Sequence, residues 1–247
     1  MTEKRFNTLF NAFILIGMTV VLLVITAFKL QTAESGKALL IVAAAGSLCG
    51  ILSTVCSANG RILTFLFGFF DVSIYGVMCL LGSKYGNAAL HLLYFLPMQF
   101  VGFFQWRKRG AGTGEKPRAR RLTPRQRTLW GLIFLAALTA AYFILLAFDK
   151  TEAASVVKVA VLMDAFSTVC NIIGQLLLST AYMEQWVFWI GVNVSTIVMW
   201  AVTLSGGGDS AYATIYIVKY SFYLINSLNG LRIWYNLSRE DVGPSAE

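Results

Sequence analysis

The sequence contains few charged residues and a single histidine. Charged residues make up 13% of its 247 positions, whereas soluble domains carry about a quarter. The chain has no GxGxxG or GxxxxGK loop, no nucleophile motif and no cluster of residues with metal-ligand spacing. We therefore expect no enzyme, no bound cofactor, no metal site and no ATP-driven pump.

Cysteine and proline are also scarce, with four of each. None of the cysteines has the CxxC spacing of a zinc site, and all lie in apolar runs, so we interpret them as small buried hydrophobic residues: Cys49, Cys56, Cys79 and Cys170. Pro97 falls inside an apolar run, where it predicts a helix kink that frees a backbone carbonyl near Gln99.

Hydrophobic residues are abundant, at 57% of the chain. They form about eight runs of about 20 residues, the length of helix that crosses a bilayer core. The first run is longer than the apolar core of a signal peptide, about 7–15 residues, so we expect it to be retained. We predict an all-α integral membrane protein with eight transmembrane helices at 6–28, 37–57, 62–81, 87–107, 127–148, 155–180, 183–204 and 211–236.

One loop, residues 107–127, concentrates the positive charge of the chain. It contains one acid, Glu115, and these basic residues: Arg107, Lys108, Arg109, Lys116, Arg118, Arg120, Arg121, Arg125 and Arg127. Basic loops lie on the cytoplasmic side of membranes, so eight spans place both termini there too. This pattern accounts for the net charge of +8 without a nucleic-acid partner. We interpret the loop as a solvated, mobile cytoplasmic linker.

Two triplets of spans resemble each other weakly. Phe67-x3-Asp71-x-Ser73 matches Trp189-x3-Asn193-x-Ser195, and Gly102-x3-Trp106 matches Gly230-x3-Trp234, in the same order along the chain. One span separates the triplets, so both enter the membrane from the same side. This predicts two parallel three-helix repeats joined by a linker helix, a SWEET-like arrangement, with substrate at the repeat interface near the midplane. The corresponding divisions are an N-terminal helix at 1–36, a first bundle at 37–107, the basic loop and linker helix at 108–154, a second bundle at 155–236 and a cytoplasmic tail at 237–247.

Polar residues recur at membrane depth, where each ionisable group costs at least about 2.5–3.5 kcal/mol on insertion scales. Helical spacing gathers them on shared faces that we expect to line a polar cavity: Trp189 with Asn193; Asp164 with Asn171 and Gln175; Tyr216 with Lys219, Tyr223 and Asn226. Asp71 and Gln99 lie in earlier spans. A structural alternative stays open, in which single amides join helices and Asp71 or Asp164 pairs with Lys219 to hold the helices in register.

The segments Tyr94–Trp106, Trp186-x2-Trp189-x3-Asn193-Val194 and Tyr220–Trp234 resemble the PnuC-type vitamin transporters. The resemblance implies a bacterial inner-membrane protein, eight helices in a one-three-one-three order and a homotrimer. It also implies uptake of nicotinamide riboside by facilitated diffusion, with a cytoplasmic riboside kinase retaining the product. Carried onto this chain, Trp189 and Asn193 match the nicotinamide-recognising positions, and Gln99 matches the glutamine of the Pro-Met-Gln motif.

The chemistry of nicotinamide riboside suits these residues. Its pyridinium ring is cationic and is attracted to an indole face by about 0.5–2 kcal/mol, and its carboxamide needs a donor and an acceptor. Helix-face geometry extends the candidate site to Asn171, Gln175, Tyr223 and Asn226. A phosphate would require Arg or Lys, and Lys219 is the only one away from the ends of the spans, which favours the dephosphorylated nucleoside. Three alternatives remain: a proton-coupled symporter with Asp71 or Asp164 as relay, a transporter of thiamine or riboflavin, and a membrane receptor or channel.

Overall fold

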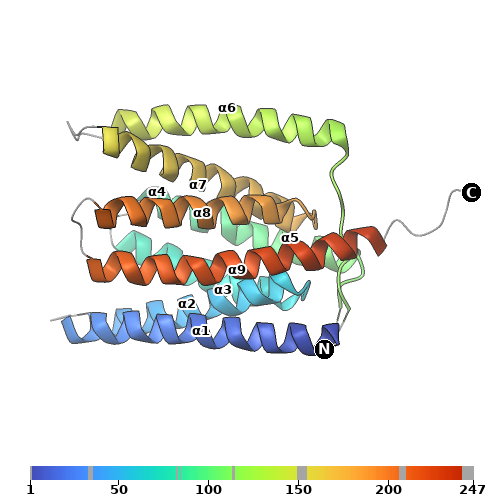
Figure 1. Cartoon of the computed structure of the whole chain (residues 1–247), viewed down its shortest axis with the longest axis horizontal. Helices are drawn as coiled ribbons and strands as arrows, with labels where there is room; N and C mark the ends of the chain where they lie inside the picture. Colours follow the sequence, from blue (N-terminus) through green and yellow to red (C-terminus); the bar gives the residue numbers. More distant parts are fainter. Residues whose placement is uncertain are drawn as a thin grey trace, which may run out of the picture. The chain divides into compact units, whose positions relative to one another are not determined.

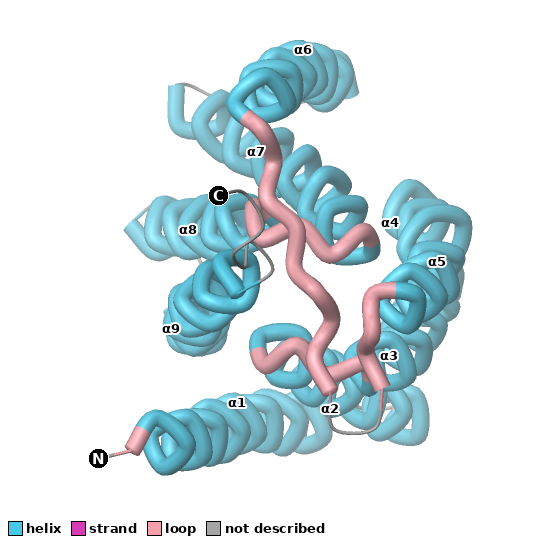
Figure 2. Tube along the Cα trace, turned by 90° about the vertical axis from the view of Figure 1, so that its right-hand side faces the viewer, coloured by secondary structure: helices cyan, strands magenta, loops and turns pink. Residues whose placement is uncertain are grey.

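The computed structural model describes residues 2–32, 36–81, 83, 85–112, 115–148, 155–205 and 210–240. Nothing in these ranges is a β-strand, apart from an isolated bridge between Arg120 and Tyr182 (Figure 2). The helices are labelled in Figure 1 and have these bounds: α1 Glu3–Thr32, α2 Lys37–Ala58, α3 Leu63–Leu81, α4 Tyr85–Ala89, η1 Leu90–Phe95, α5 Leu96–Lys108, α6 Pro124–Phe148, α7 Ser155–Ser179, α8 Gln185–Ser205 and α9 Ser210–Glu240. The predicted all-helical class is therefore confirmed.

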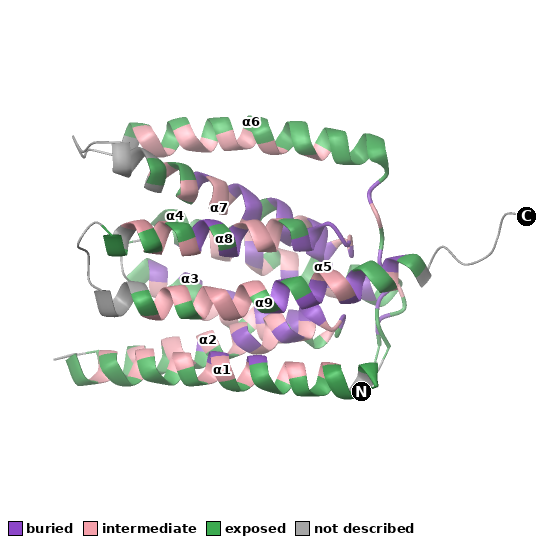
Figure 3. Ribbon diagram, viewed as in Figure 1, coloured by how far each residue is buried: buried purple, intermediate pink, exposed green. Residues whose placement is uncertain are grey.

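Within the described ranges, seven helical segments are long and apolar enough to cross a membrane. They correspond to the first seven predicted spans, with α4, η1 and α5 together forming the fourth, Tyr85–Lys108. Helix α9, the predicted eighth span, is 31 residues long but does not pass the same test. In α6 no residue of the apolar stretch is buried (Figure 3). Lipid is the expected surrounding of such a surface, because water would be a poor solvent for it.

The fourth span is not a regular α-helix. A π-helical segment, η1, runs from Leu90 to Phe95 and ends two residues before Pro97. The Leu96 N–H donates to the His91 carbonyl five residues earlier, and Pro97 has no N–H to continue the α-helical pattern. The predicted irregularity is thus a π-helical turn, a feature often found at functional sites.

The chain divides into two compact units. Unit 1 comprises Met1–Arg118 with Ser179–Ala181, and unit 2 comprises Ala119–Leu178 with Tyr182–Glu247. Unit 1 therefore contains α1 to α5, and unit 2 contains α6 to α9.

Hydrogen bonds and small residues hold the helices of unit 1 together. The Asn11 and Asn59 side-chain amides bond each other reciprocally at 3.0 Å and join α1 to the end of α2. Between α2 and α3, the Ser53 hydroxyl donates to the Thr64 carbonyl at 2.8 Å, and the Thr64 hydroxyl donates to the Ser53 carbonyl at 3.0 Å. Both bonds pair groups that lipid could not satisfy.

Unit 2 contains an apolar cluster that joins α6, α7 and α8. Leu122, Val169, Ile173 and Leu177 form a buried cluster against which α6 and α8 contribute further hydrophobic side chains. The ring of Phe134 in α6 contacts Phe166 of α7 and Phe188 of α8, with centroids 5.3 and 6.0 Å away.

The two predicted repeats share one detail of local packing. In unit 1, Gly102 of α5 lies against the ring of Phe65 at the start of α3, and Trp106 is fully buried. In unit 2, Gly230 of α9 lies against the ring of Trp186 at the start of α8, and Trp234 is fully buried. In both places a glycine admits an aromatic ring that a Cβ atom would exclude.

The basic loop is not the free linker that its composition predicts. Four of its side chains are buried: Ala111, Pro117, Ala119 and Leu122. The Arg118 N–H donates to the Arg109 carbonyl at 2.9 Å, and the Met183 N–H donates to the Arg120 carbonyl at 2.9 Å. Contacts that the composition does not reveal therefore satisfy some of the loop's backbone groups.

Candidate functional site

Two neighbouring positions on α8 form the centre of the candidate site. Trp189 is half-buried, whereas Asn193, one helical turn later, is 6% exposed. The Asn193 amide Nδ2 donates to the hydroxyl oxygen of Ser227 in α9 at 3.0 Å. In the described part of the chain the Asn193 carbonyl oxygen Oδ1 has no donor. The arrangement therefore offers an indole face and an oriented hydrogen-bond acceptor.

A glycine in α7 makes room for the indole. A Cβ atom on Gly174 would lie 3.3 Å from the Phe188 Cβ and 3.4 Å from the Trp189 ring. The next residue, Gln175, is buried. In contrast, the Trp186 ring is fully packed on Gly230. Of the two tryptophans in this motif, Trp189 has the more accessible surface.

Asn171, one turn before Gln175, is half-buried and bonded within its own helix. Its Nδ2 donates to the Ser167 carbonyl at 2.9 Å. This local bond uses one of its two amide hydrogens. Asn171 and Gln175 thus lie on the α7 stripe that the sequence predicts.

The predicted face of α9 combines aromatic rings with one ammonium group. The Lys219 Nζ lies 5.8, 5.8 and 5.7 Å from the ring centroids of Tyr216, Tyr220 and Tyr223. Tyr216 stacks on Trp200 of α8, with centroids 4.5 Å apart and planes 4° from parallel. Further along the helix, Asn226 is completely buried beside Ser227. The aromatic part of this face contacts α8 through Tyr216, and the residue after Asn226, Ser227, contacts α8 through Asn193.

Gln99 and Asp71 belong to unit 1, whereas the other candidate residues belong to unit 2. Gln99 is buried, its Nε2 donates to the Phe95 carbonyl at 3.1 Å, and its Oε1 packs directly on Gly68 of α3. Asp71 is half-buried, and its Oδ1 would lie 2.8 Å from a Cβ on Gly50 of α2. Both side chains therefore lie where a glycine brings two helices close together.

Asp164 is the candidate that the structure separates from the rest. Its side chain is exposed on α7, and among the described residues it forms no ion pair with Lys219. The proposed register-holding pair of Asp164 and Lys219 is therefore wrong. Seven residues leave Asp164 within about 20° of the Asn171 face, so the difference in exposure comes with its place two turns nearer the start of α7.

The profile of the nicotinamide mononucleotide transporter family matches residues 40–236 of this chain. The chain belongs to that family. It is accordingly a multi-pass membrane transporter and not an enzyme.

Relatives and a solved structure agree with this family membership. The nicotinamide riboside transporter PnuC of Neisseria mucosa is 33% identical over 207 residues, which cover 81% of this chain and 74% of the relative. The transporter of the same name from Haemophilus influenzae is 28% identical over 209 residues, covering 84% and 82%. The crystal structure of the vitamin B3 transporter PnuC superposes with a TM-score of 0.65 at 30% identity, covering 97% of this chain and 94% of that one.

Two residues that contact or precede the helices of the site, Ser227 and Glu184, were not found from the sequence. Ser227 carries no signal of its own, because a small hydroxyl in a span is common helix packing. Glu184 was also missed, although it is the only acid in the short segment between α7 and α8. It is buried, and it bonds residues 57 and 62 positions away.

Proposed function

We propose that this transporter takes up nicotinamide riboside by facilitated diffusion with alternating access. The observation that carries the proposal is the Trp189–Asn193 pair, in which a half-buried indole lies one turn from an amide whose NH₂ end is bonded to Ser227. The names of the Neisseria and Haemophilus relatives support the same substrate.

The substrate's two distinctive groups fit this pair. A pyridinium cation on the Trp189 face gains about 0.5–2 kcal/mol, more when water is excluded. The carboxamide NH₂ is a donor that the Asn193 Oδ1 accepts. We assign recognition of the remaining amide and ribose hydroxyls to these polar side chains: Gln99, Asn171, Gln175, Tyr223 and Asn226.

The family is named for the mononucleotide and the relatives for the riboside, two compounds that differ by a phosphate. A phosphate dianion in a low-dielectric site needs paired cations, typically Arg. Among the candidate residues only Lys219 is basic, and its ammonium lies near three tyrosine rings. This environment supports the riboside, which has no phosphate, as the preferred substrate over the mononucleotide.

The finer architecture is part of the same proposal. We infer that α9 is an eighth span, because 31 residues make a helix of about 46 Å, longer than the bilayer core. The basic segment and both termini then lie in the cytoplasm of a bacterium, at its inner membrane. The matching glycine–aromatic packing at Gly102 and Gly230 supports two parallel, SWEET-like repeats. A homotrimer and a cytoplasmic riboside kinase complete the proposal by family resemblance.

Uptake of labelled nicotinamide riboside into proteoliposomes tests the site. We expect Trp189→Ala and Asn193→Ala each to reduce uptake by about tenfold or more. Phe143→Ala in α6 and Asn87→Ala in α4 are controls that remove an exposed aromatic ring and an exposed amide elsewhere, and they should keep uptake near wild type. Undiminished uptake in both site variants would rule out the proposed site.

A substrate panel tests the chemistry separately. Unlabelled riboside should compete with labelled riboside, whereas its mononucleotide, thiamine and riboflavin should compete at least about tenfold less well. Stronger competition by the mononucleotide would reverse the assignment of the dephosphorylated form.

Proton-coupled symport is a second candidate, because Asp71 is a half-buried carboxyl inside α3 and buried carboxyls serve as proton relays in transporters. The measurement is concentrative uptake with an inward proton gradient. Accumulation that depends on the gradient and is lost in Asp71→Asn would establish coupling, and equilibration without accumulation would reject it.

A further inference from the structure

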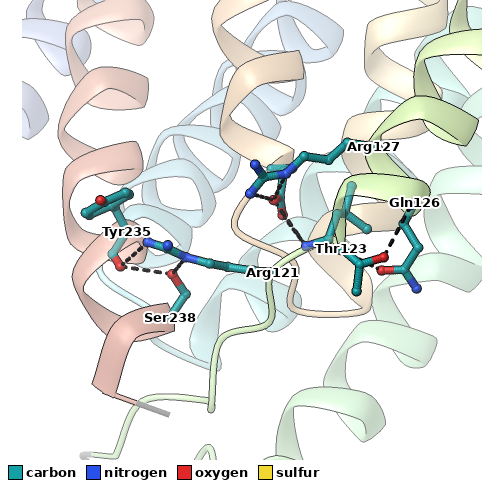
Figure 4. Close-up of polar contacts among 8 residues, drawn as sticks. Arg121, Thr123, Gln126, Arg127, Tyr235 and Ser238 are labelled. Atoms are coloured by element: carbon teal, nitrogen blue, oxygen red, sulfur yellow. Dashed lines mark hydrogen bonds and ion pairs between the residues drawn. The ribbon is translucent and has the colours of Figure 1, made fainter. Parts of the chain in front are cut away.

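The second half of the basic loop, Arg120–Arg127, is attached to unit 2 by a compact set of contacts, and we name this segment the clasp. The Arg120 backbone pairs with the chain at Tyr182 and Met183, and the Arg120 guanidinium lies 4.2 Å from the Tyr182 ring centroid. At its other end the clasp begins α6 with a capping box. The Thr123 N–H donates to Gln126 Oε1 at 2.9 Å, and the Gln126 N–H donates to Thr123 Oγ1 at 3.3 Å (Figure 4).

The carboxylate of Glu184 is the main polar anchor of the clasp. The Leu122 N–H donates to its two oxygens at 3.1 and 3.2 Å. Arg127 donates to Oε1 from Nε at 3.2 Å and from Nη2 at 3.0 Å. The Glu184 side chain is 10% exposed and that of Arg127 is 53% exposed. A buried carboxylate with charged and backbone donors is held firmly in one geometry, because each bond to an ion is stronger than its neutral counterpart.

The same short segment starts α8. The first N–H groups of that helix donate to the carbonyls just before it: Gln185 to Tyr182, Trp186 to Met183 and Val187 to Glu184, at 3.3, 3.2 and 3.1 Å. Residues 182–184 therefore bond the clasp on one side and the first turn of α8 on the other. Trp189 follows Glu184 by five residues, a rise of about 7.5 Å.

The clasp also bonds α9, the helix that contains Ser227. Arg121 donates from Nε to the Ser238 hydroxyl at 2.7 Å and from Nη2 to the Tyr235 carbonyl at 3.2 Å, and its guanidinium lies 4.3 Å from the Tyr235 ring centroid (Figure 4). One eight-residue segment thus bonds the start of α8 and the end of α9, the two helices that form the Asn193–Ser227 bond.

We propose that Glu184 is a positioning residue for substrate recognition. Through the clasp it fixes the first turn of α8 and thereby the direction in which Trp189 faces α7 and Asn193 faces α9. The inference rests on the proposed function, because it uses nicotinamide riboside as the ligand whose affinity reports this geometry. Glu184 itself does not touch the substrate.

The test measures the Kd of nicotinamide riboside by calorimetry on purified full-length protein, with the melting temperature of the same samples. Glu184→Ala removes all four bonds, Glu184→Gln keeps an acceptor for the Leu122 N–H, and Arg127→Gln removes only the guanidinium. We expect Kd to rise about tenfold, about fivefold and about threefold, respectively. Glu115→Gln and Arg125→Gln are matched controls, since both are exposed residues of the same loop, and their Kd should equal that of wild type.

The graded rise in Kd separates positioning from a purely structural role, which would lower the melting temperature and leave the Kd of the folded protein unchanged. Folded Glu184→Ala and Glu184→Gln proteins that bind like wild type overturn the inference. If Glu184→Ala does not fold, an unchanged Kd in both Glu184→Gln and Arg127→Gln overturns it equally. Wild-type protein that binds no riboside overturns the proposed function as well, whereas normal wild-type binding with unaffected variants refutes only the role of Glu184.

Discussion

Asn193 in α8 and Ser227 in α9 are joined by a hydrogen bond of 3.0 Å, in which the amide Nδ2 donates to the hydroxyl oxygen. Both side chains are buried, at 6% and 3% exposure. An asparagine amide can be turned by 180° with little change in shape, and only its hydrogen bonds decide which end faces outward. In this structure the NH₂ end of Asn193 is bonded to Ser227, which leaves the carbonyl oxygen to be presented as an acceptor.

Ser227→Ala removes that acceptor and leaves the amide donor of Asn193 buried without it. An unmade hydrogen bond of this kind costs about 1–3 kcal/mol, so we expect the KM of riboside uptake to rise about fivefold or more. Ser205→Ala, at an exposed hydroxyl on the same pair of helices, is the control and should not change KM. An unchanged KM in Ser227→Ala would show that the amide is oriented by something else.

The position of the Gln99 side chain depends on the absence of a side chain at Gly68. The Oε1 of Gln99 occupies the space where a side chain on Gly68 would begin. Gly68→Ala should therefore displace the Gln99 amide, at a cost of about 1–3 kcal/mol for overpacking, and lower both the melting temperature and the affinity for riboside. Gly131→Ala in α6 is the control, because nothing lies within 4 Å of its added methyl group. If Gly68→Ala binds riboside normally, Gln99 does not recognise the substrate.

The repeated glycine–aromatic packing makes a paired prediction. Gly102→Ala forces a methyl group into the Phe65 ring, and Gly230→Ala forces one into the Trp186 ring. Each should lower the melting temperature by about 2–10 °C. Phe65→Leu should partly rescue Gly102→Ala, because a smaller side chain accommodates the new methyl group. If either glycine variant is as stable as wild type, the two helices that meet at that glycine can move apart at no cost, which would contradict the close packing.

The spans could be predicted from sequence because hydropathy over about 20 residues is a local property. The local motifs could also be predicted. Helical spacing alone places Trp189 and Asn193 on one face, and Pro97 indicated an irregular helix. The sequence could not specify that the irregularity is the π-helical segment Leu90–Phe95, because side chains around Pro97 decide which hydrogen bonds replace the lost one.

Contacts distant in sequence explain what was missed. Glu184 gave no signal in the sequence, since its partners Leu122 and Arg127 lie 62 and 57 residues away. The loop looked mobile because its charge and glycines are visible in the sequence, whereas the burial of Leu122 depends on α7. Asp164 was placed on a polar stripe by counting residues, and the count holds to within about 20°, but counting along one helix does not show whether another helix covers that face, and Asp164 is exposed.

The positive charge of the pyridinium ring provides the most direct test of Trp189. The reduced, dihydropyridine form of nicotinamide riboside keeps the carboxamide and the ribose but has no ring charge, so it loses the cation–π attraction alone. We expect wild-type protein to bind the reduced form about two- to thirtyfold more weakly than the cation, from the usual 0.5–2 kcal/mol of such contacts. In Trp189→Ala this preference should disappear while both forms bind more weakly, and in Trp189→Phe part of it should remain because the phenyl face is a poorer partner than indole. Competition against labelled riboside, with Asn193→Ala as the matched variant that weakens both forms equally, measures each case. A preference for the cation that survives Trp189→Ala would mean that another group, such as the half-buried carboxyl of Asp71, recognises the charge.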